Sequence, residues 1–174
     1  MRTAQSKAAG VAHRLTGPGI EEDYYGWLLD QASALRVRRH SALDWENLAE
    51  EVEGMGRTEA HALESYLEVL LQHLLKWQFQ PARRSGSWRA SVQNARSDVR
   101  ERLNESPSLR RKLPELLSRA YEKARRSAGA EMKLDERQWN AKLPAACPWE
   151  FDLLMREDFW PGPANNSNGR KHSR

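Results

Sequence analysis

His73 is the residue that most invites a chemical role, because it falls on the apolar side of a long predicted helix, between Leu70 and Trp77. A buried imidazole needs a hydrogen-bond partner, and the preceding acidic segment offers Glu50 and Glu53. The sequence therefore predicts a buried polar pair of His73 with one of these carboxylates, which would fix the register of two helices. The alternative is a catalytic His–Glu pair, which would make the protein an enzyme centred on His73.

Motifs for metal binding and for nucleophilic catalysis are absent from the sequence. Di-metal helical bundles use Glu-x-x-His pairs, and none occurs here. His61 and His73 are 12 residues apart, about 120° around a helix, so they cannot share a metal ion. The single cysteine, Cys147, is followed by proline and is interpreted as a packing residue. We predict no metal, no cofactor and no catalytic residue. The sequence does not decide whether the protein is an enzyme, but it favours a protein that is not one.

The segment 76–89, KWQFQPARRSGSWR, mixes cations with aromatic side chains. Such a mixture can hold phosphates with arginines while an aromatic ring stacks on a base. In the alternative interpretation the tryptophans are core anchors, and the arginines cap helices or pair with acidic residues. No helix-turn-helix, phosphate loop or zinc finger indicates sequence-specific DNA recognition. The candidate anion-binding residues are Arg83, Arg84, Arg89 and Arg96.

Three aromatic residues near the C-terminus, Trp149, Phe159 and Trp160, form a candidate anchor for a partner protein. Aromatic side chains are favoured at the centre of protein interfaces. The same residues would serve equally well as a lid over one end of a helical bundle.

Charge is unevenly distributed along the chain. Residues 21–75 contain four Lys and Arg against twelve Asp and Glu, whereas residues 76–126 contain fourteen against five. Either the two stretches neutralise one another within the fold, or the basic stretch faces outward and meets an anion such as nucleic acid.

Apolar residues recur at helical spacing in most of the chain, and no stretch alternates as a strand would. In the second of the predicted helices, Trp45, Leu48, Ala49 and Val52 are expected to form the buried stripe, and Gly54 and Gly56 are expected to end the helix. The fold class is therefore all-α, an antiparallel bundle of about four main helices with short accessory helices. The predicted helices cover about residues 22–38, 45–53, 58–78, 88–104, 109–133 and 149–155.

The ends of the chain differ from its middle in composition. Residues 1–20 are predicted to be a flexible segment, 21–161 a single helical-bundle domain, and 162–174 a disordered polar tail. With one cysteine and no apolar run near the roughly 20 residues that span a bilayer, the composition predicts a soluble, cytoplasmic protein without a transmembrane segment.

Three blocks of the sequence resemble a known family. Residues 48–92 resemble the signature of the bacterial family called domain of unknown function 29, residues 23–36 are similar to its opening helix, and residues 147–161 to its closing segment. The resemblance implies a compact helical domain and no particular activity.

The sequence leaves three hypotheses for function. The first is a non-enzymatic interaction domain that binds a protein partner or pairs with itself. The second is a nucleic-acid-binding protein that uses the basic face of residues 76–126. The third is the enzyme centred on His73 and a glutamate of the acidic helix.

Overall fold

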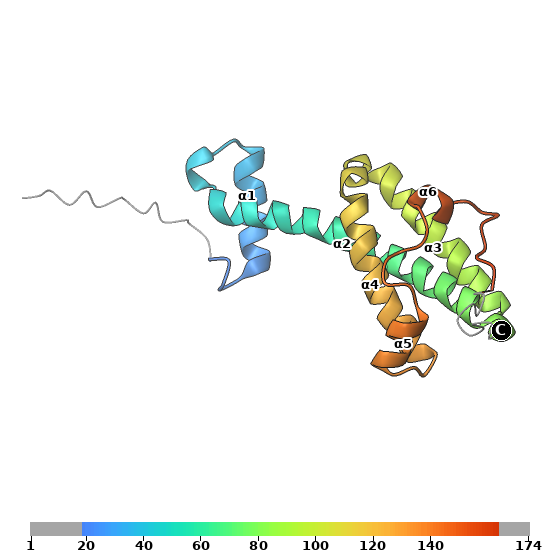
Figure 1. Ribbon diagram of the computed structural model, residues 1–174. Coiled ribbons are helices and arrows are strands. Elements are labelled where there is room, and N and C mark those ends of the chain that lie inside the picture. The colour runs from blue at the N-terminus through green and yellow to red at the C-terminus, as the bar shows by residue number, and fades with distance from the viewer. Residues whose placement is uncertain (1–18, 164–174) are drawn as a thin grey trace, which may run out of the picture. The chain divides into compact units, whose positions relative to one another are not determined.

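A computed structural model of the chain describes residues 19–163. Within this range the protein has six α-helices, three short 3-10 helices and no strand, so the predicted all-α class is confirmed (Figure 1). The chain divides into two compact units with the boundary after Gly56. The single helical-bundle domain over 21–161 stays a prediction. The predicted flexible segment 1–20 and polar tail 162–174 lie almost wholly outside the described residues.

Unit 1, which ends at Gly56, contains α1 (Tyr24–Arg36), η1 (His40–Ala42) and the start of α2 (Trp45–Phe79). The Asp23 side chain caps α1 by accepting a hydrogen bond of 2.9 Å from the Gly26 amide. Trp27 and Leu43 are the largest buried side chains of this unit. Gln31, also buried, accepts a 2.8 Å hydrogen bond from the Asp44 amide and so ties α1 to the start of α2.

The α2 helix corrects the prediction of two helices separated at Gly54 and Gly56. It runs through both glycines as one helix of 35 residues. A glycine ends a helix when it takes a left-handed conformation, and Gly56 does not take one. Two glycines inside a helix lower its stability by only about 1 kcal/mol each. The favourable helix propensity of the residues on either side outweighs this cost.

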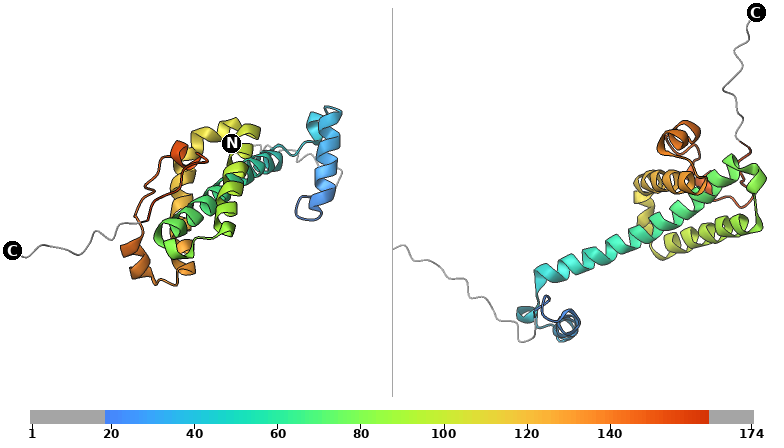
Figure 2. Two further views of the ribbon diagram at one scale, coloured as in Figure 1. Left: turned by 90° about the vertical axis from the view of Figure 1, so that its right-hand side faces the viewer. Right: turned by 90° about the horizontal axis from the view of Figure 1, so that it is seen from below.

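Unit 2 is built on an up-down-up arrangement of the second half of α2, α3 (Gly86–Glu105) and α4 (Leu113–Glu131). The α2 and α3 helices run antiparallel side by side (Figure 2), joined through η2 (Pro81–Arg83). Ser85 caps α3 by accepting a hydrogen bond from the Trp88 amide. The η3 segment (Pro107–Lys112) then reverses the chain into α4. With α1 of unit 1, these three helices make up the four main helices that the sequence predicts.

The core of unit 2 is a leucine stripe of α2 packed against α3 and α4. The apolar residues of α3, which are spaced three or four positions apart, are buried: Val92, Ala95, Val99 and Leu103. On α4, small side chains allow close contact: Ala120, Ala124 and Ala128 are fully buried. The α2 residues of this core are Leu63, Leu67, Leu70, Leu71, Leu74 and Leu75.

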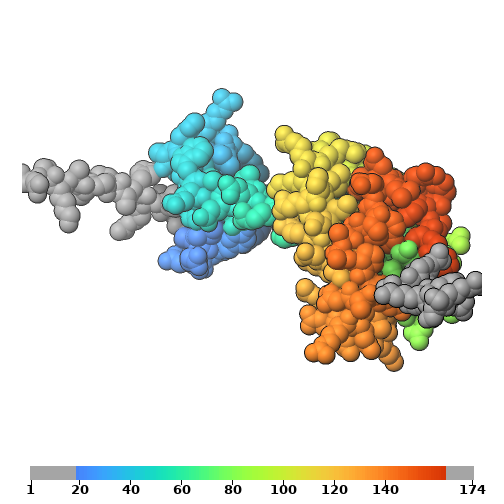
Figure 3. All heavy atoms as spheres, viewed as in Figure 1, coloured from blue at the N-terminus to red at the C-terminus, as the bar shows by residue number. Residues whose placement is uncertain are grey.

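The C-terminal part of unit 2 consists of α5 (Glu136–Lys142), α6 (Phe151–Leu154) and the segments that follow them. In Figure 3 this part, orange to red, occupies much of the visible face of the unit. The sequence analysis missed α5, although a capping box of Asp135 and Gln138 marks its start.

The packing of α5 on α4 at Gly129 can be tested by measuring stability. A Cβ atom added at Gly129 would lie 2.8 Å from the Trp139 side chain. Gly129→Ala should therefore lower the free energy of unfolding by about 1–3 kcal/mol. Gly56→Ala is the matched control: its Cβ would meet nothing within 4 Å, so it should raise stability by about 0.5–1 kcal/mol. Urea unfolding of both variants checks the pair, and a stabilising Gly129→Ala would contradict the close packing.

Candidate functional site

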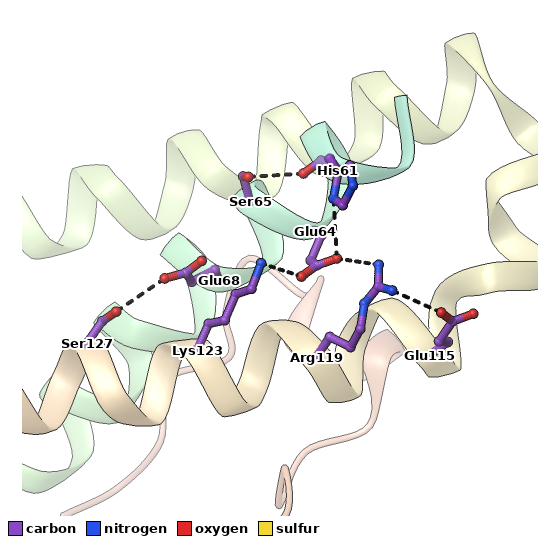
Figure 4. A network of polar contacts seen from close by, with 8 residues as sticks. All are labelled: His61, Glu64, Ser65, Glu68, Glu115, Arg119, Lys123 and Ser127. Atoms are coloured by element: carbon purple, nitrogen blue, oxygen red, sulfur yellow. Dashed lines mark hydrogen bonds and ion pairs between the residues drawn. The ribbon is translucent and has the colours of Figure 1, made fainter. Parts of the chain in front are cut away.

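A ladder of polar contacts joins α2 to α4 and uses much of the charge of unit 2 (Figure 4). Glu64, almost fully buried, accepts hydrogen bonds from Arg119 at 2.5 Å and from Lys123 at 2.7 Å. Four residues further along each helix, Ser127 donates to Glu68 at 3.2 Å. A further step along, Gln72 and the buried Lys76 both donate to Glu131. The spacing of four residues on both helices means that this ladder holds α2 and α4 parallel and in register.

The pKa of Glu64 follows from this setting. Burial by itself raises the pKa of the carboxyl, but hydrogen bonds from Lys123 and Arg119 outweigh it and hold the pKa below its ordinary value. A carboxyl with a lowered folded-state pKa stabilises the fold above its unfolded-state pKa, and that stabilisation is lost as pH falls through the folded-state pKa.

A pH-dependent prediction follows for Glu64→Gln. The variant should lose about 1–3 kcal/mol at pH 7, because the charge-assisted hydrogen bonds weaken. Its deficit should shrink as pH falls below about 4, where the wild-type carboxyl itself takes up a proton. Urea unfolding at a series of pH values measures both effects. A deficit that stays constant between pH 7 and pH 3 would contradict the assignment of the effect to the ionised carboxylate.

The predicted buried pair of His73 with Glu50 or Glu53 is wrong. His73 is only half-buried, and its Nδ1 lies 2.9 Å from the Val69 carbonyl oxygen on the preceding turn of its own helix. Glu50 and Glu53 are exposed and belong to unit 1, whereas His73 belongs to unit 2. The three residues were expected on two helices, but one continuous α2 carries them all.

Arg96 corrects the candidate anion-binding set, because it is a structural residue. Its guanidinium is 1% exposed and donates to the carbonyl oxygens of Leu154 at 2.8 Å, Phe159 at 2.7 Å and Glu157 at 3.3 Å. Burial lowers the pKa of this guanidinium, although arginine keeps its charge in proteins. Arg96 therefore ties the segment after α6 to α3, and no phosphate can reach it.

The other three arginines of that set differ in how far they are engaged. Arg84 donates from Nε to the Trp77 carbonyl oxygen at 2.9 Å and lies over the Trp77 ring. Arg89 is exposed but lies over the rings of Trp77 and Trp160. Arg83 is exposed, with no ion pair to another residue in the range 19–163. The structure therefore does not bring these three side chains together around a single phosphate position.

The predicted aromatic anchor is built into the fold. Trp149 is buried and meets Phe159 edge to face, with ring centroids 6.0 Å apart. Trp160 packs on Trp77 at a centroid distance of 4.5 Å. All three residues contact the core of unit 2, as the lid interpretation expects, and the partner-anchor interpretation stays a prediction for the half-buried Phe159 and Trp160.

The large exposed apolar side chains lie almost entirely in unit 1. Among the described residues nine large hydrophobic side chains are exposed, and Val69 is the one that lies in unit 2. The two most exposed are Tyr25, at 71%, and Met55, at 70%. The unit 1 members are Tyr24, Tyr25, Leu29, Leu35, Val37, Trp45, Val52 and Met55.

The α1 helix is apolar on two opposite sides. One side turns Trp27 and Ala34 into unit 1. At about 100° per residue, Tyr25 and Leu29 lie on the other side, together with the half-buried Ala32. An apolar side of a helix normally faces a packing partner, and here one of the two apolar sides is exposed.

The start of α2 shows the same feature. The stripe predicted to be buried there includes Trp45 and Val52, and the structure leaves them 59% and 65% exposed. Ala49 is also exposed, and Leu48 is half-buried. The helical periodicity is as predicted, but the stripe is only partly covered: within unit 1 the Trp45 ring meets the His40 ring at a centroid distance of 6.2 Å. We name the exposed apolar residues of α1 and of this part of α2 the unit 1 apolar surface.

Comparison with known proteins identifies the family. A family model described as domain of unknown function DUF29 matches residues 20–160. The chain belongs to the DUF29 family. The match spans both units of this DUF29 protein and agrees with the resemblance seen in its opening, central and closing blocks. No curated protein and no solved structure matches the chain.

The described part of this DUF29 protein has neither a metal-ligand cluster nor a membrane-spanning helix. Between residues 19 and 163, no group of three or more His, Cys, Asp or Glu side chains is placed to hold a metal ion. Over the same range, none of the helices combines the length and the apolar character that crossing a membrane requires.

Proposed function

We propose that this DUF29 protein is a protein-interaction module whose unit 1 apolar surface binds a basic, apolar-faced helix of a partner protein. The observation that carries the proposal is the exposure of two apolar stripes, on α1 and on the start of α2. Contiguous exposed apolar surface on a folded protein marks an interaction site. An amphipathic helix that lays its apolar side on such a surface is a recurrent mode of recognition.

The balance of buried and exposed residues in unit 1 supports the need for a partner. Among its described residues, 19–56, the buried ones are Trp27, Gln31, Ala34 and Leu43, while eight large apolar side chains are exposed. Covering those side chains with a partner would supply the burial that unit 1 lacks.

Charge indicates which kind of partner fits. Residues 19–56 contain nine Asp and Glu but only three Lys and Arg, which are Arg36, Arg38 and Arg39 at the end of α1 and beyond it. A second copy of unit 1 would bring two acidic surfaces together, whereas a basic partner would be attracted. The apolar stripes supply affinity and the surrounding carboxylates supply selectivity.

The alternatives have less support. Nucleic-acid binding would rest on Arg83, Arg126 and the run Arg110–Lys112, because Arg96 is buried and Arg102, Arg119 and Lys123 pair with glutamates. The enzyme hypothesis loses its proposed carboxylate partner, because His73 contacts a backbone carbonyl of its own helix.

Titration with a model helix tests the proposal. The full-length protein is titrated with an 18-residue amphipathic peptide of leucine and lysine, and separately with the matching peptide of leucine and glutamate. We expect a dissociation constant in the micromolar range or below for the lysine peptide and at least about tenfold weaker binding of the glutamate peptide. Equal affinity for both peptides, or none for either, would overturn the proposal. Self-association in sedimentation that blocks the lysine peptide would instead assign the surface to a second copy.

A further inference from the structure

A pocket in unit 2, separate from the unit 1 apolar surface, has the features of a small-molecule site. It has a volume of about 560 Å³ and lies between α4 and the segment that leads from α5 into α6. This volume is within the range of about 300–1,000 Å³ that is typical of ligand sites. The α4 helix contributes Leu113, Leu117, Ser118, Tyr121 and Glu122, and the facing wall contains Ala145, Ala146, Cys147, Trp149, Glu150 and Phe151.

The inner walls of this pocket are largely apolar and aromatic, and two of their polar groups are engaged. The Tyr121 hydroxyl donates a 3.0 Å hydrogen bond to the Pro144 carbonyl oxygen. The Cys147 thiol donates to the Trp149 carbonyl oxygen at 3.3 Å. These bonds fix the two walls. The small side chains of Ala145 and Ala146 keep the space between the walls open.

The charge of the pocket is negative. Glu122 and Glu150 are the charged residues in its lining, both are exposed, and neither carboxylate has a hydrogen bond or an ion pair with another residue of the range 19–163. The neighbouring cation, Arg125, lies behind the lining: it donates to the carbonyl oxygens of Ala145 and Leu143 and to Asn140, and it lies over the Trp139 ring.

We infer that this pocket binds a small organic ammonium ion with an aromatic or branched alkyl body. The apolar body would displace water from the walls formed by Leu117, Tyr121 and Phe151, and the cation would lie at the rim near Glu122 and Glu150. Aromatic rings and carboxylates both attract an ammonium group, and partial exclusion of water strengthens both interactions. An anion of the same size would be repelled.

Cys147 provides a reporter for the test, because it is the only cysteine of the sequence and it lines the pocket. The rate of its modification by a thiol reagent is measured with benzyltrimethylammonium, with benzyl alcohol and with phenylacetate. We expect saturating benzyltrimethylammonium to slow modification at least about tenfold, and the other two compounds to have little effect. Protection by phenylacetate equal to that by benzyltrimethylammonium, or no protection by any of the three, would overturn the inference.

Charge-neutral variants complete the test. Glu122→Gln combined with Glu150→Gln should raise the benzyltrimethylammonium concentration needed for half-protection at least about tenfold. Glu136→Gln, an exposed carboxylate outside the lining, is the matched control and should leave it unchanged. The Glu150 charge itself raises the pKa of the Cys147 thiol, so each variant is compared with its own rate without the compound. A double variant with unchanged half-protection would contradict the role of the two carboxylates.

The reactivity of Cys147 in the unliganded protein gives a separate prediction. Burial raises the pKa of this thiol above its ordinary value, and the Glu150 carboxylate adds to the shift. Because the thiolate is the reacting form, the modification rate should still be rising with pH at and above pH 9. A rate that is level by pH 8 would show a thiol with a lowered pKa, which would be the property of a catalytic cysteine.

Discussion

Replacing Arg96 with alanine should lower the free energy of unfolding by about 3–5 kcal/mol, because three backbone carbonyl groups lose their hydrogen-bond donor. The guanidinium is the hydrogen-bond donor to the carbonyl oxygens of Leu154, Glu157 and Phe159, and it lies over the Trp160 ring at 5.4 Å. A buried carbonyl that loses its donor costs about 1–3 kcal/mol. The total loss of unfolding free energy should stay below three such penalties, because water can reach the freed carbonyl groups once the segment loosens.

Urea unfolding followed by tryptophan fluorescence measures this effect, since Trp160 reports on the segment that Arg96 holds. Arg126→Ala is the control, because Arg126 is an exposed arginine of α4 without an ion pair in the described range; it should change stability by less than about 0.5 kcal/mol. A loss below about 1 kcal/mol in Arg96→Ala would contradict the structural role and return Arg96 to the candidate anion-binding residues.

Replacing Leu29 with aspartate should weaken binding of the lysine-containing peptide at least about 100-fold, or about 3 kcal/mol. Leu29 is 52% exposed on the outer side of α1, so the change costs little stability but places a charge in the middle of the proposed interface. The direction of the change in affinity separates apolar contact from electrostatic attraction. Because the variant adds a negative charge, a purely electrostatic attraction to the basic peptide would become stronger. Weaker binding therefore requires apolar contact.

Val69→Asp is the matched control for this second prediction. Val69 is the large exposed hydrophobic residue that lies outside unit 1, at 40% exposure. The same chemical change there should leave peptide affinity within about threefold of the wild-type value, with circular dichroism confirming that both variants are folded. Equal losses of affinity in the two variants would contradict a surface confined to unit 1.

The exposed stripe of α2 shows what sequence periodicity can and cannot predict. The spacing of Trp45, Leu48 and Val52 correctly predicts one apolar side of a helix. Whether that side is buried depends on what packs against it, and within unit 1 only part of it is covered, with the His40 ring against Trp45 and Leu48 half-buried. This difference between prediction and structure supports an interaction surface, because an apolar side of a helix that is normally buried is exposed in the isolated chain.

Arg96 and His73 show a second limit, which concerns contacts between distant residues. Both lie in helices, as the spacing of apolar residues predicts. Local features of α3 depend on neighbouring residues alone: Ser85 caps the helix, and its apolar residues from Val92 to Leu103 are buried. The partners of Arg96, however, lie about 60 residues further along the chain, and no local pattern specifies them. For His73 the error was to treat an apolar neighbourhood as burial, when a backbone carbonyl one turn away satisfies the ring.

Amide hydrogen exchange of the full-length protein, with and without a saturating amount of the lysine-containing peptide, tests the central claim most directly. The account predicts slower exchange in α1 and in residues 45–55 when the peptide is bound, because covering an apolar surface suppresses local opening. It predicts unchanged exchange in α3 and α4. Protection confined to α3 and α4, or no protection in α1 at saturation, would contradict the assignment of unit 1 as the interaction surface.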